Sequence, residues 1–186
     1  MSPTVRCYRP FEVAGSMQFN VSDLLREGYG AFREFDIDDD VMIDGARRHI
    51  EGRARFDRTP EGVLVRAKLH GSTESECSRC LRPVTLLVEF ELDEQFIPTI
   101  DPVTSAQITP PAGEEDAYRI TERHMLDLTE PVRQYWTLAV PMAPVCRGDC
   151  PGLCPDCGKE RTADHACAGE SIDARWEKLR DLGPGS

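Results

Sequence analysis

The sequence has no long apolar run, few aromatic residues and a shortage of positive charge. Because no run of about 18 apolar residues occurs, we expect no transmembrane helix. The first residues, Met1 to Cys7, lead into no apolar segment, so we expect no signal peptide and a cytoplasmic location. In a reducing compartment, closely spaced cysteines favour metal or redox sites over structural disulfides.

Positive charge is the scarcer sign, with 22 lysine and arginine residues against 33 aspartate and glutamate residues. The formal net charge is −11, and thiolates bound to metal would make it more negative. A polyanion is repelled by phosphate backbones unless its few cations are clustered. The charge therefore disfavours direct binding to bare RNA and agrees better with a basic protein partner.

The first half of the chain carries the patterns of β-strands. Residues 63–69 and 85–92 are β-rich with partial alternation, and residues 50–56 are a weaker candidate. The segment Thr59 to Gly62 has the composition of a turn, which indicates a hairpin. Residues 20–25 are expected to form a short helix capped by Asn20.

The acidic run at residues 36–40 is expected to be a solvated loop. A calcium-binding EF-hand loop needs glycine at its sixth position and glutamate at its twelfth. Counted from Asp36, those positions hold Val41 and Arg47, so we expect no calcium site.

A helix is expected in the second half, where apolar residues recur at helical spacing from Leu128 to Ala139. Thr129 is the expected cap, Pro131 lies in the first turn, and Pro141 ends the helix. A last short helix is expected with Asp173 as cap and apolar residues on one side, namely Trp176, Leu179 and Leu182.

The predicted organisation is an α+β fold with an antiparallel, β-rich N-terminal half, either a sheet or a partly open barrel. Residues 1–97 form the β-rich portion of the core, and residues 98–117, with four prolines, form an acidic linker. Residues 118–145 form a helical portion packed on that core. Residues 146–182 form a cysteine-rich, metal-binding segment with the terminal helix.

Seven of the eight cysteines and one histidine fall into four closely spaced pairs: Cys77 and Cys80, Cys146 and Cys150, Cys154 and Cys157, His165 and Cys167. Short spacing lets both ligands reach one ion, at about 2.3 Å for sulfur. The turn between them also aims backbone N–H groups at the thiolates. Pro155 and Gly158 suit such a tight turn. A closed structural zinc site takes four ligands, so we expect two Zn²⁺ ions.

The spacing also predicts how the eight ligands divide. Seven residues separate Cys157 from His165, enough for the last four ligands to close one site locally. The other two pairs, Cys77 with Cys80 and Cys146 with Cys150, would form a second site across 65 residues. The alternative places the middle two pairs, which are only three residues apart, on one ion, and that arrangement is strained. Cys7 has no partner by spacing, and three histidines stand alone: His49, His70 and His124.

Three other chemistries agree less well with these cysteines. The spacing from Cys150 to Cys157 fits a radical-generating iron–sulfur cluster, but only 29 residues follow it. A thiol–disulfide CxxC pair opens a helix, whereas Cys77 and Cys80 lie between two strands. Catalytic zinc needs an open coordination position, and both proposed sites are full. We therefore expect no enzymatic activity.

The order of the motifs resembles the YceD family, the large ribosomal RNA subunit accumulation proteins. The motifs are Cys77–Leu81, Asp127–Thr129, Leu138–Cys146, Gly152–Gly158 and Ile172–Trp176. The resemblance implies a non-enzymatic role in ribosome biogenesis that supports synthesis, processing or accumulation of 23S rRNA. Its implied partner is a pre-ribosomal large-subunit ribonucleoprotein or a basic ribosomal protein.

The chain departs from the family pattern at three positions. His165 stands where a cysteine is usual, which zinc tolerates because imidazole is also a ligand. Ala174 stands where proline is usual, and Pro131 where an apolar helix residue is usual. A different class of function, handling metal or thiol-redox state, for instance zinc delivery to a ribosomal protein, remains the alternative.

Overall fold

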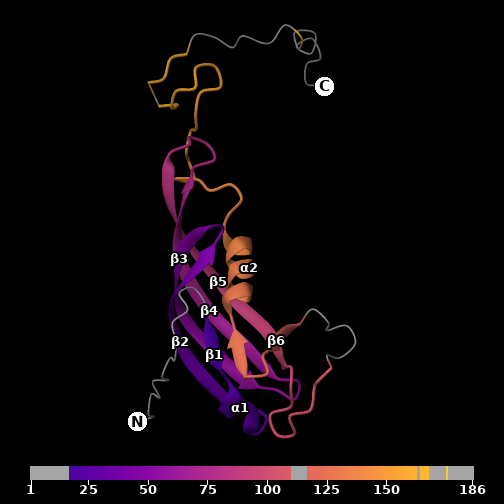
Figure 1. The fold of residues 1–186 in the computed structure, drawn as a ribbon. Coiled ribbons are helices and arrows are strands. Elements are labelled where there is room, and N and C mark those ends of the chain that lie inside the picture. The colour runs from indigo at the N-terminus through magenta and orange to yellow at the C-terminus, as the bar shows by residue number, and fades with distance from the viewer. Residues whose placement is uncertain (1–16, 110–116, 163, 168–174, 176–186) are drawn as a thin grey trace, which may run out of the picture. The chain divides into compact units, whose positions relative to one another are not determined.

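The computed structural model describes residues 17–109, 117–162, 164–167 and 175 (Figure 1). The chain divides into two compact units. Unit 1 takes residues from Met1–Glu74 and Thr85–Met142, and unit 2 from Ser75–Val84 and Ala143–Ser186. The elements, in chain order, are β1 (Gln18–Asn20), α1 (Ser22–Arg26), β2 (Phe32–Ile43), β3 (Ala46–Arg58), β4 (Val63–Glu76), β5 (Pro83–Pro98), β6 (Tyr118–Ile120), β7 (Met125–Asp127) and α2 (Thr129–Ala139).

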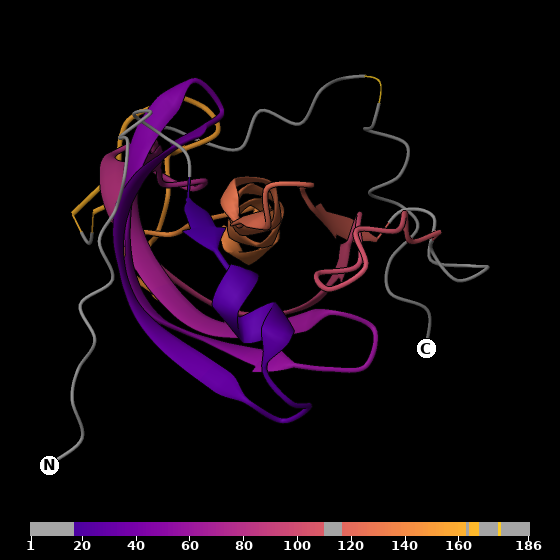
Figure 2. The same cartoon turned by 60° about the horizontal axis from the view of Figure 1, so that its bottom comes forward.

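Unit 1 is organised around a five-stranded sheet in the order β2-β3-β4-β5-β6, with a separate two-stranded sheet of β1 and β7. The pairs β2–β3 and β3–β4 are antiparallel, and β6 runs parallel to β5. Figure 2 shows the large sheet curled around α2. The predicted α+β class, with a strand-rich N-terminal half and a following helix, is confirmed.

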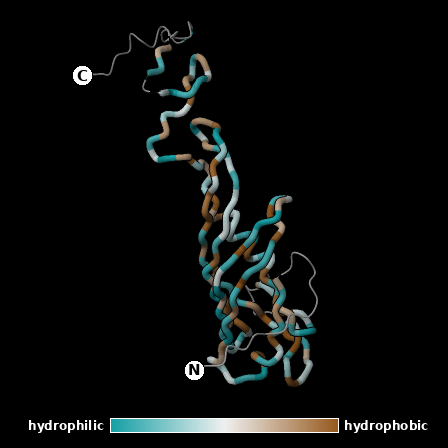
Figure 3. The backbone as a smooth tube through the Cα atoms, turned by 90° about the vertical axis from the view of Figure 1, so that its left-hand side faces the viewer, coloured by the Kyte–Doolittle hydropathy of each residue, from teal (hydrophilic) through white to brown (hydrophobic). Residues whose placement is uncertain are grey.

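The core of unit 1 follows from alternation along the strands and from one face of α2. Figure 3 shows hydrophobic and hydrophilic residues alternating along the strands. Phe56 is fully buried, and its ring lies 4.7 Å from that of Phe35. From the helix, Val132 is fully buried and Trp136 meets Phe90 edge-on at 6.3 Å. The strands thus bury one face, as period-two patterning requires.

The expected acidic loop at residues 36–40 is wrong, because these residues lie within β2. Ile37 and Val41 are buried in the core, Asp38 and Asp40 are exposed on the other face, and Asp39 is half-buried. On β3, Arg53 stands opposite Asp36 and His49 opposite Asp40, whereas Asp38 faces Glu51. Cross-strand pairs of opposite charge make such a strand acceptable despite the low β-propensity of aspartate.

Both predicted helix caps are displaced by one residue. Helix α1 begins at Ser22, whose N–H donates to Asn20 Oδ1 at 3.0 Å, while Val21 is the capping position. Thr129 is the first residue of α2 rather than its cap. Its N–H donates to Asp127 Oδ1 at 2.8 Å, so a residue two positions earlier satisfies the free N–H.

The turn at residues 59–62 is confirmed, since Thr59 N–H donates to Gly62 O at 3.0 Å between β3 and β4. Residues 99–109 contain no helix or strand, only a bridge between Ile100 and Gln107. The predicted terminal helix after Asp173 and the isolated Cys7 lie outside the described residues. None of the described helices is both long and apolar enough to cross a membrane.

Candidate metal centres

Unit 2 is built around its cysteines. Its buried cluster consists of Cys77, Cys80 and Cys150, against which Val145, Cys146 and Leu153 pack. Cys77 and Cys80 lie in the turn between β4 and β5, and Cys146 and Cys150 follow α2 in the sequence. The structure thus gathers ligands that are 65 residues apart in the chain, as the spacing predicts.

The first cluster has the dimensions of a tetrahedral site. The Cys77 and Cys150 Sγ atoms lie 3.9 Å apart, and those of Cys80 and Cys146 lie 3.7 Å apart. All four Sγ atoms lie within 4.8 Å of one another. Four sulfurs at about 2.3 Å from one zinc ion would be about 3.8 Å apart. A disulfide requires about 2.05 Å, and all four thiols are free.

Backbone hydrogen bonds hold the loops of the first cluster. Cys77 N–H donates to Arg82 O at 2.8 Å, and Leu81 N–H donates to Cys77 O at 2.9 Å. Ser78 N–H donates to Pro144 O at 2.7 Å, which ties the turn to the segment carrying the second pair. The four sulfurs are therefore positioned by the backbone.

The protonation of the first cluster is uneven. Backbone N–H groups, first that of Cys146 and then that of Cys80, lower the pKa of the Cys77 thiol to about 6. Hydrogen bonding to Cys150, together with burial, raises the pKa of Cys146 to about 12. The cluster holds thiolate and thiol side by side, and a bound cation would displace the remaining protons.

The second cluster consists of Cys154, Cys157, His165 and Cys167, whose ligand atoms also lie within 4.8 Å of one another. Cys157 Sγ and His165 Nε2 are 3.5 Å apart. A sulfur and an imidazole nitrogen on one tetrahedral zinc ion would be about 3.6 Å apart. Cys154 is buried and Cys157 is exposed, so this cluster is more open to solvent than the first.

A tight turn forms the first half of the second cluster. Cys154 N–H donates to Lys159 O at 2.7 Å, and Gly158 N–H donates to Cys154 O at 2.9 Å. Gly158 has a φ of 69°, a conformation that favours glycine. The N–H groups of Cys157 and Asp156 lower the pKa of Cys154 to about 6. The prediction of a glycine-dependent turn here is confirmed.

The segment between the two clusters is fixed by Gly152. Leu153 N–H donates to Arg79 O at 3.0 Å, and Arg161 N–H donates to Gly152 O at 2.9 Å. Gly152 has a φ of 75°, and a Cβ atom there would lie 3.1 Å from Arg79 O. The segment that connects the two clusters therefore depends on glycine at position 152, both for its backbone conformation and for its close approach to Arg79.

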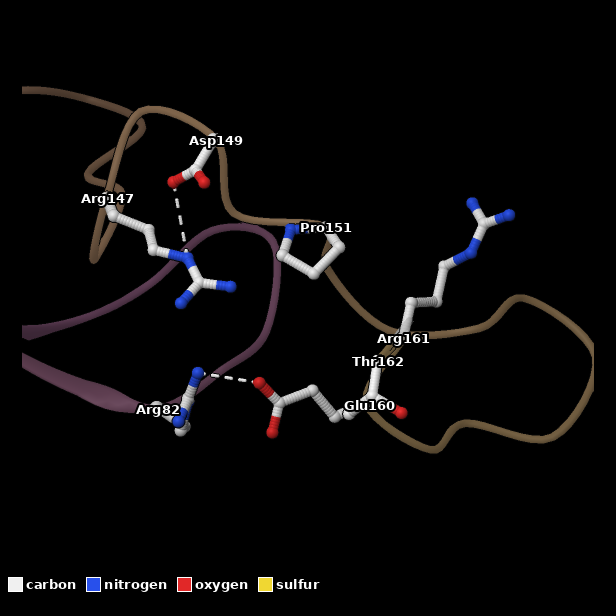
Figure 4. A pocket seen from close by; sticks show the side chains of 7 residues that line it. All are labelled: Arg82, Arg147, Asp149, Pro151, Glu160, Arg161 and Thr162. Carbon is white, nitrogen blue, oxygen red and sulfur yellow. Dashed lines mark hydrogen bonds and ion pairs between the residues drawn. The ribbon is translucent and has the colours of Figure 1, made fainter. Parts of the chain in front are cut away.

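A hollow of about 590 Å³ lies beside the clusters (Figure 4). Arg82 bonds Glu160 at 2.6 Å, and Arg147 lies 3.3 Å from Asp149, so each lining carboxylate already has an arginine partner. The described lining residues offer no nucleophile beside a free base. We find no catalytic arrangement in this part of the described chain.

All eight predicted ligands lie in the two clusters, with the predicted division. Sequence reasoning missed one group. His49 does not stand alone, because Asp38, Asp40 and Glu51 surround it on the outer face of the sheet. The alternation of polar residues along β2 and β3 could have indicated this group. Using it would have required recognising β2 as a strand and knowing its register with β3.

Proteins of three mycobacterial species are similar to this chain. The uncharacterized proteins Rv2926c of Mycobacterium tuberculosis and Mb2951c of Mycobacterium bovis are each 38% identical over 133 residues, or 71% of this chain and 61% of the relative. The uncharacterized protein ML1660 of Mycobacterium leprae is 34% identical over 128 residues, or 69% of this chain and 56% of the relative. The chain spans about three fifths of the length of the relatives it matches. No solved structure matches it.

The family model described as "Large ribosomal RNA subunit accumulation protein YceD" matches residues 65–183. That range covers well over half of the chain and includes every member of both clusters. The chain therefore belongs to the YceD family of large ribosomal RNA subunit accumulation proteins.

Proposed function

We propose that this protein is a zinc-stabilised, non-enzymatic factor that supports accumulation of large-subunit ribosomal RNA in the cytoplasm. Membership of the YceD family is the observation that carries the proposal. Within that process, the protein would act in the synthesis or processing of 23S rRNA and in the assembly of the large subunit. Zinc ions bound by the two clusters would stabilise the protein.

Zinc is the ion that suits both ligand sets best. Sets of four thiolates, or three thiolates and one imidazole, at tetrahedral separations are typical of structural zinc. Soft thiolate ligands also disfavour magnesium, calcium and manganese. The Cys77 and Cys150 sulfurs, at 3.9 Å, lie close to the edge length that zinc would set.

The closed ligand sets argue for a scaffold rather than a catalyst. A catalytic zinc ion keeps one position for water or substrate. Each cluster here supplies four side chains, which fill a tetrahedral ion. The backbone bonds that fix Cys77 and Cys154 also leave little freedom for a ligand to step aside.

The charge supports a basic partner. The net charge of −11 favours association with a basic ribosomal protein or a pre-ribosomal particle that presents one. Bare RNA is the less favoured partner, because each phosphate would meet a predominantly acidic surface.

The first test is complementation in cells that lack the protein, with the ratio of 23S to 16S rRNA as the readout. Wild type should restore the ratio, whereas Cys150→Ser should fail because it removes a buried ligand. A matched control is Ser78→Ala, which changes a side chain in the same loop but no ligand. Native mass spectrometry should find two zinc ions in wild type and fewer in Cys150→Ser. A metal-free wild-type protein that still restores the ratio would contradict the zinc part of the proposal.

The second test identifies the partner by pull-down with the full chain, before and after ribonuclease treatment. Capture of a basic large-subunit protein that survives ribonuclease is the expected result. Capture of RNA alone, lost after treatment, would show that the charge argument is wrong.

A second candidate function, zinc delivery, has one observation in its favour. Cys157 is exposed, so a ligand from another protein can approach the second cluster from solvent. Competition with a graded series of chelators separates the two functions. Delivery requires one ion that exchanges quickly and binds more weakly than the recipient does, and two slowly exchanging ions would exclude it.

A further inference from the structure

The outer face of the large sheet carries a polar cluster that neither metal centre uses. The strand register places Asp38 of β2 opposite Glu51 of β3, and Glu51 opposite His70 of β4. In the next cross-strand pair on the same face, Asp40 stands opposite His49. The side chains of these five residues are all exposed and come from paired positions on adjacent strands.

Distances within this cluster centre on the His49 imidazole. His49 Nε2 lies 3.2 Å from Glu51 Oε1 and 3.5 Å from Asp38 Oδ1. One nitrogen and two carboxylate oxygens on a tetrahedral ion would be about 3.4 Å apart, from bond lengths of about 2.1 Å. The three ligand atoms lie within 4.8 Å of one another.

Asp40 also orients the His49 imidazole through its other ring nitrogen, Nδ1. His49 Nδ1 lies 3.1 Å from Asp40 Oδ1, so its N–H can donate to that carboxylate and leave Nε2 free as a ligand. A carboxylate on the far nitrogen of a metal-binding histidine is a recurrent arrangement, because it fixes both tautomer and ring orientation. On the other side, His70 Nε2 lies 3.4 Å from the second oxygen of Glu51.

Charge balance favours a cation at this position. Asp38 and Glu51 face each other directly, and like charges at opposed positions destabilise a sheet. Among the described residues, neither has a lysine or arginine within ion-pair distance; Arg47 reaches only Asp40, at 3.6 Å. Even a protonated His49 would supply one positive charge to three carboxylates.

We propose that Asp38, His49 and Glu51 form a surface site for one divalent transition-metal ion of the zinc class. Water completes the coordination, Asp40 orients the imidazole, and His70 holds Glu51. The ligands are nitrogen and oxygen rather than sulfur, which distinguishes this site from the cysteine clusters. Exposure of all three ligands makes it an exchangeable site.

The test starts from the full chain with its cysteine clusters loaded, titrated with Zn²⁺ and followed by calorimetry and by the ¹⁵N resonances of the histidine rings. One further ion per chain should bind, with a shift at His49 Nε2. His49→Ala should abolish this event. Asp40→Asn should weaken it by about 10- to 100-fold, because it removes only the orienting partner.

Asp36→Asn is the matched control, since Asp36 lies on the same face of β2 but pairs with Arg53 at 3.3 Å. It should bind the further ion as wild type does. Retention of the further ion by His49→Ala, or its absence from wild type, would overturn the proposal. The His49 resonance reports this site directly, so the result does not depend on whether the clusters hold zinc or on the ribosomal role.

Discussion

The two units solve the same stability problem with different chemistry. Unit 1 buries an extensive apolar core, in which Phe56, Leu128 and Val132 are inaccessible to solvent. The buried cluster of unit 2 is mostly cysteine, joined by only Val145 and Leu153. Burial of apolar area stabilises a domain in proportion to that area, and unit 2 has little of it. From this comparison we expect that unit 2 depends on bound metal to fold and that unit 1 does not.

Removing the metal should give the largest effect and should fall on unit 2 alone. Structural zinc contributes apparent free energies of about 10–16 kcal/mol at neutral pH. A strong chelator should therefore collapse the amide NMR signals of residues 143–162 while those of β3 and α2 persist. Cys77→Ser should act in the same direction, because its sulfur is fully buried. Simultaneous loss of the unit 1 signals would show that the units do not fold independently.

The converse experiment creates a cavity in the apolar core of unit 1. Phe56→Ala removes a fully buried ring that packs against Phe19 at 5.1 Å and Phe35 at 4.7 Å. Unit 1 should lose about 3–5 kcal/mol of unfolding free energy, measured by urea denaturation. The zinc content should remain unchanged in native mass spectrometry. A parallel loss of zinc would mean that the clusters depend on the core.

A smaller effect is expected at the passage between the clusters. Gly152→Ala places a side chain at a φ of 75° and 3.1 Å from Arg79 O. The left-handed conformation costs a non-glycine residue about 1–2 kcal/mol. Both clusters should release zinc faster to a chelator, with unit 1 unaffected. Gly148→Ala is the control, since a Cβ there meets nothing within 4 Å.

The smallest effect depends on pH and is confined to unit 1. Burial alone would raise the pKa of Asp57, but hydrogen bonds from Arg66 and Arg55 outweigh it and hold the pKa below the usual range of an aspartate. Because the folded pKa is below the unfolded one of about 3.9, the stabilisation is complete at neutral pH, well above the unfolded pKa, and is lost as the pH falls through the folded value. Asp57→Asn should therefore cost about 1 kcal/mol at neutral pH and less below pH 4.

Trp136 fluorescence in a Trp176→Phe background can follow this unfolding, because Trp136 lies in the unit 1 core. Equal destabilisation of Asp57→Asn at pH 7 and pH 3 would show that the ion pairs are not the cause. Arg53→Gln, which removes an exposed ion pair with Asp36, should change little at either pH.

Much of the fold could be predicted wherever hydrophobic patterning was decisive. Strands β4 and β5 and helix α2 were predicted, although both strands extend further than their apolar runs, to Glu76 and Pro98. β2 could not be recognised, because aspartate has a low β-propensity and only the strand register places Glu34 opposite Arg55 and Asp36 opposite Arg53. The short strands β1, β6 and β7 also escaped prediction, since three residues carry too little pattern.

The site was more predictable than the fold. Two-residue spacings at Cys77 and Cys154 impose a local geometry that depends on little else. The pairing of Cys77 and Cys80 with Cys146 and Cys150 followed by counting ligands, and the structure has the same division. The group around His49 could not be predicted, because it exists only in the register of three strands.

The two halves of the first cluster are far apart in the sequence, so they are synthesised at different times. At a synthesis rate of about 5–20 residues per second, Cys77 and Cys80 are made roughly 3–13 s before Cys146. The second cluster spans only Cys154 to Cys167 and can close almost as soon as it is made. During that interval the two earlier thiols are left with half of their ligand set. The first cluster can therefore bind a metal ion with all four ligands only after Cys150 has been synthesised.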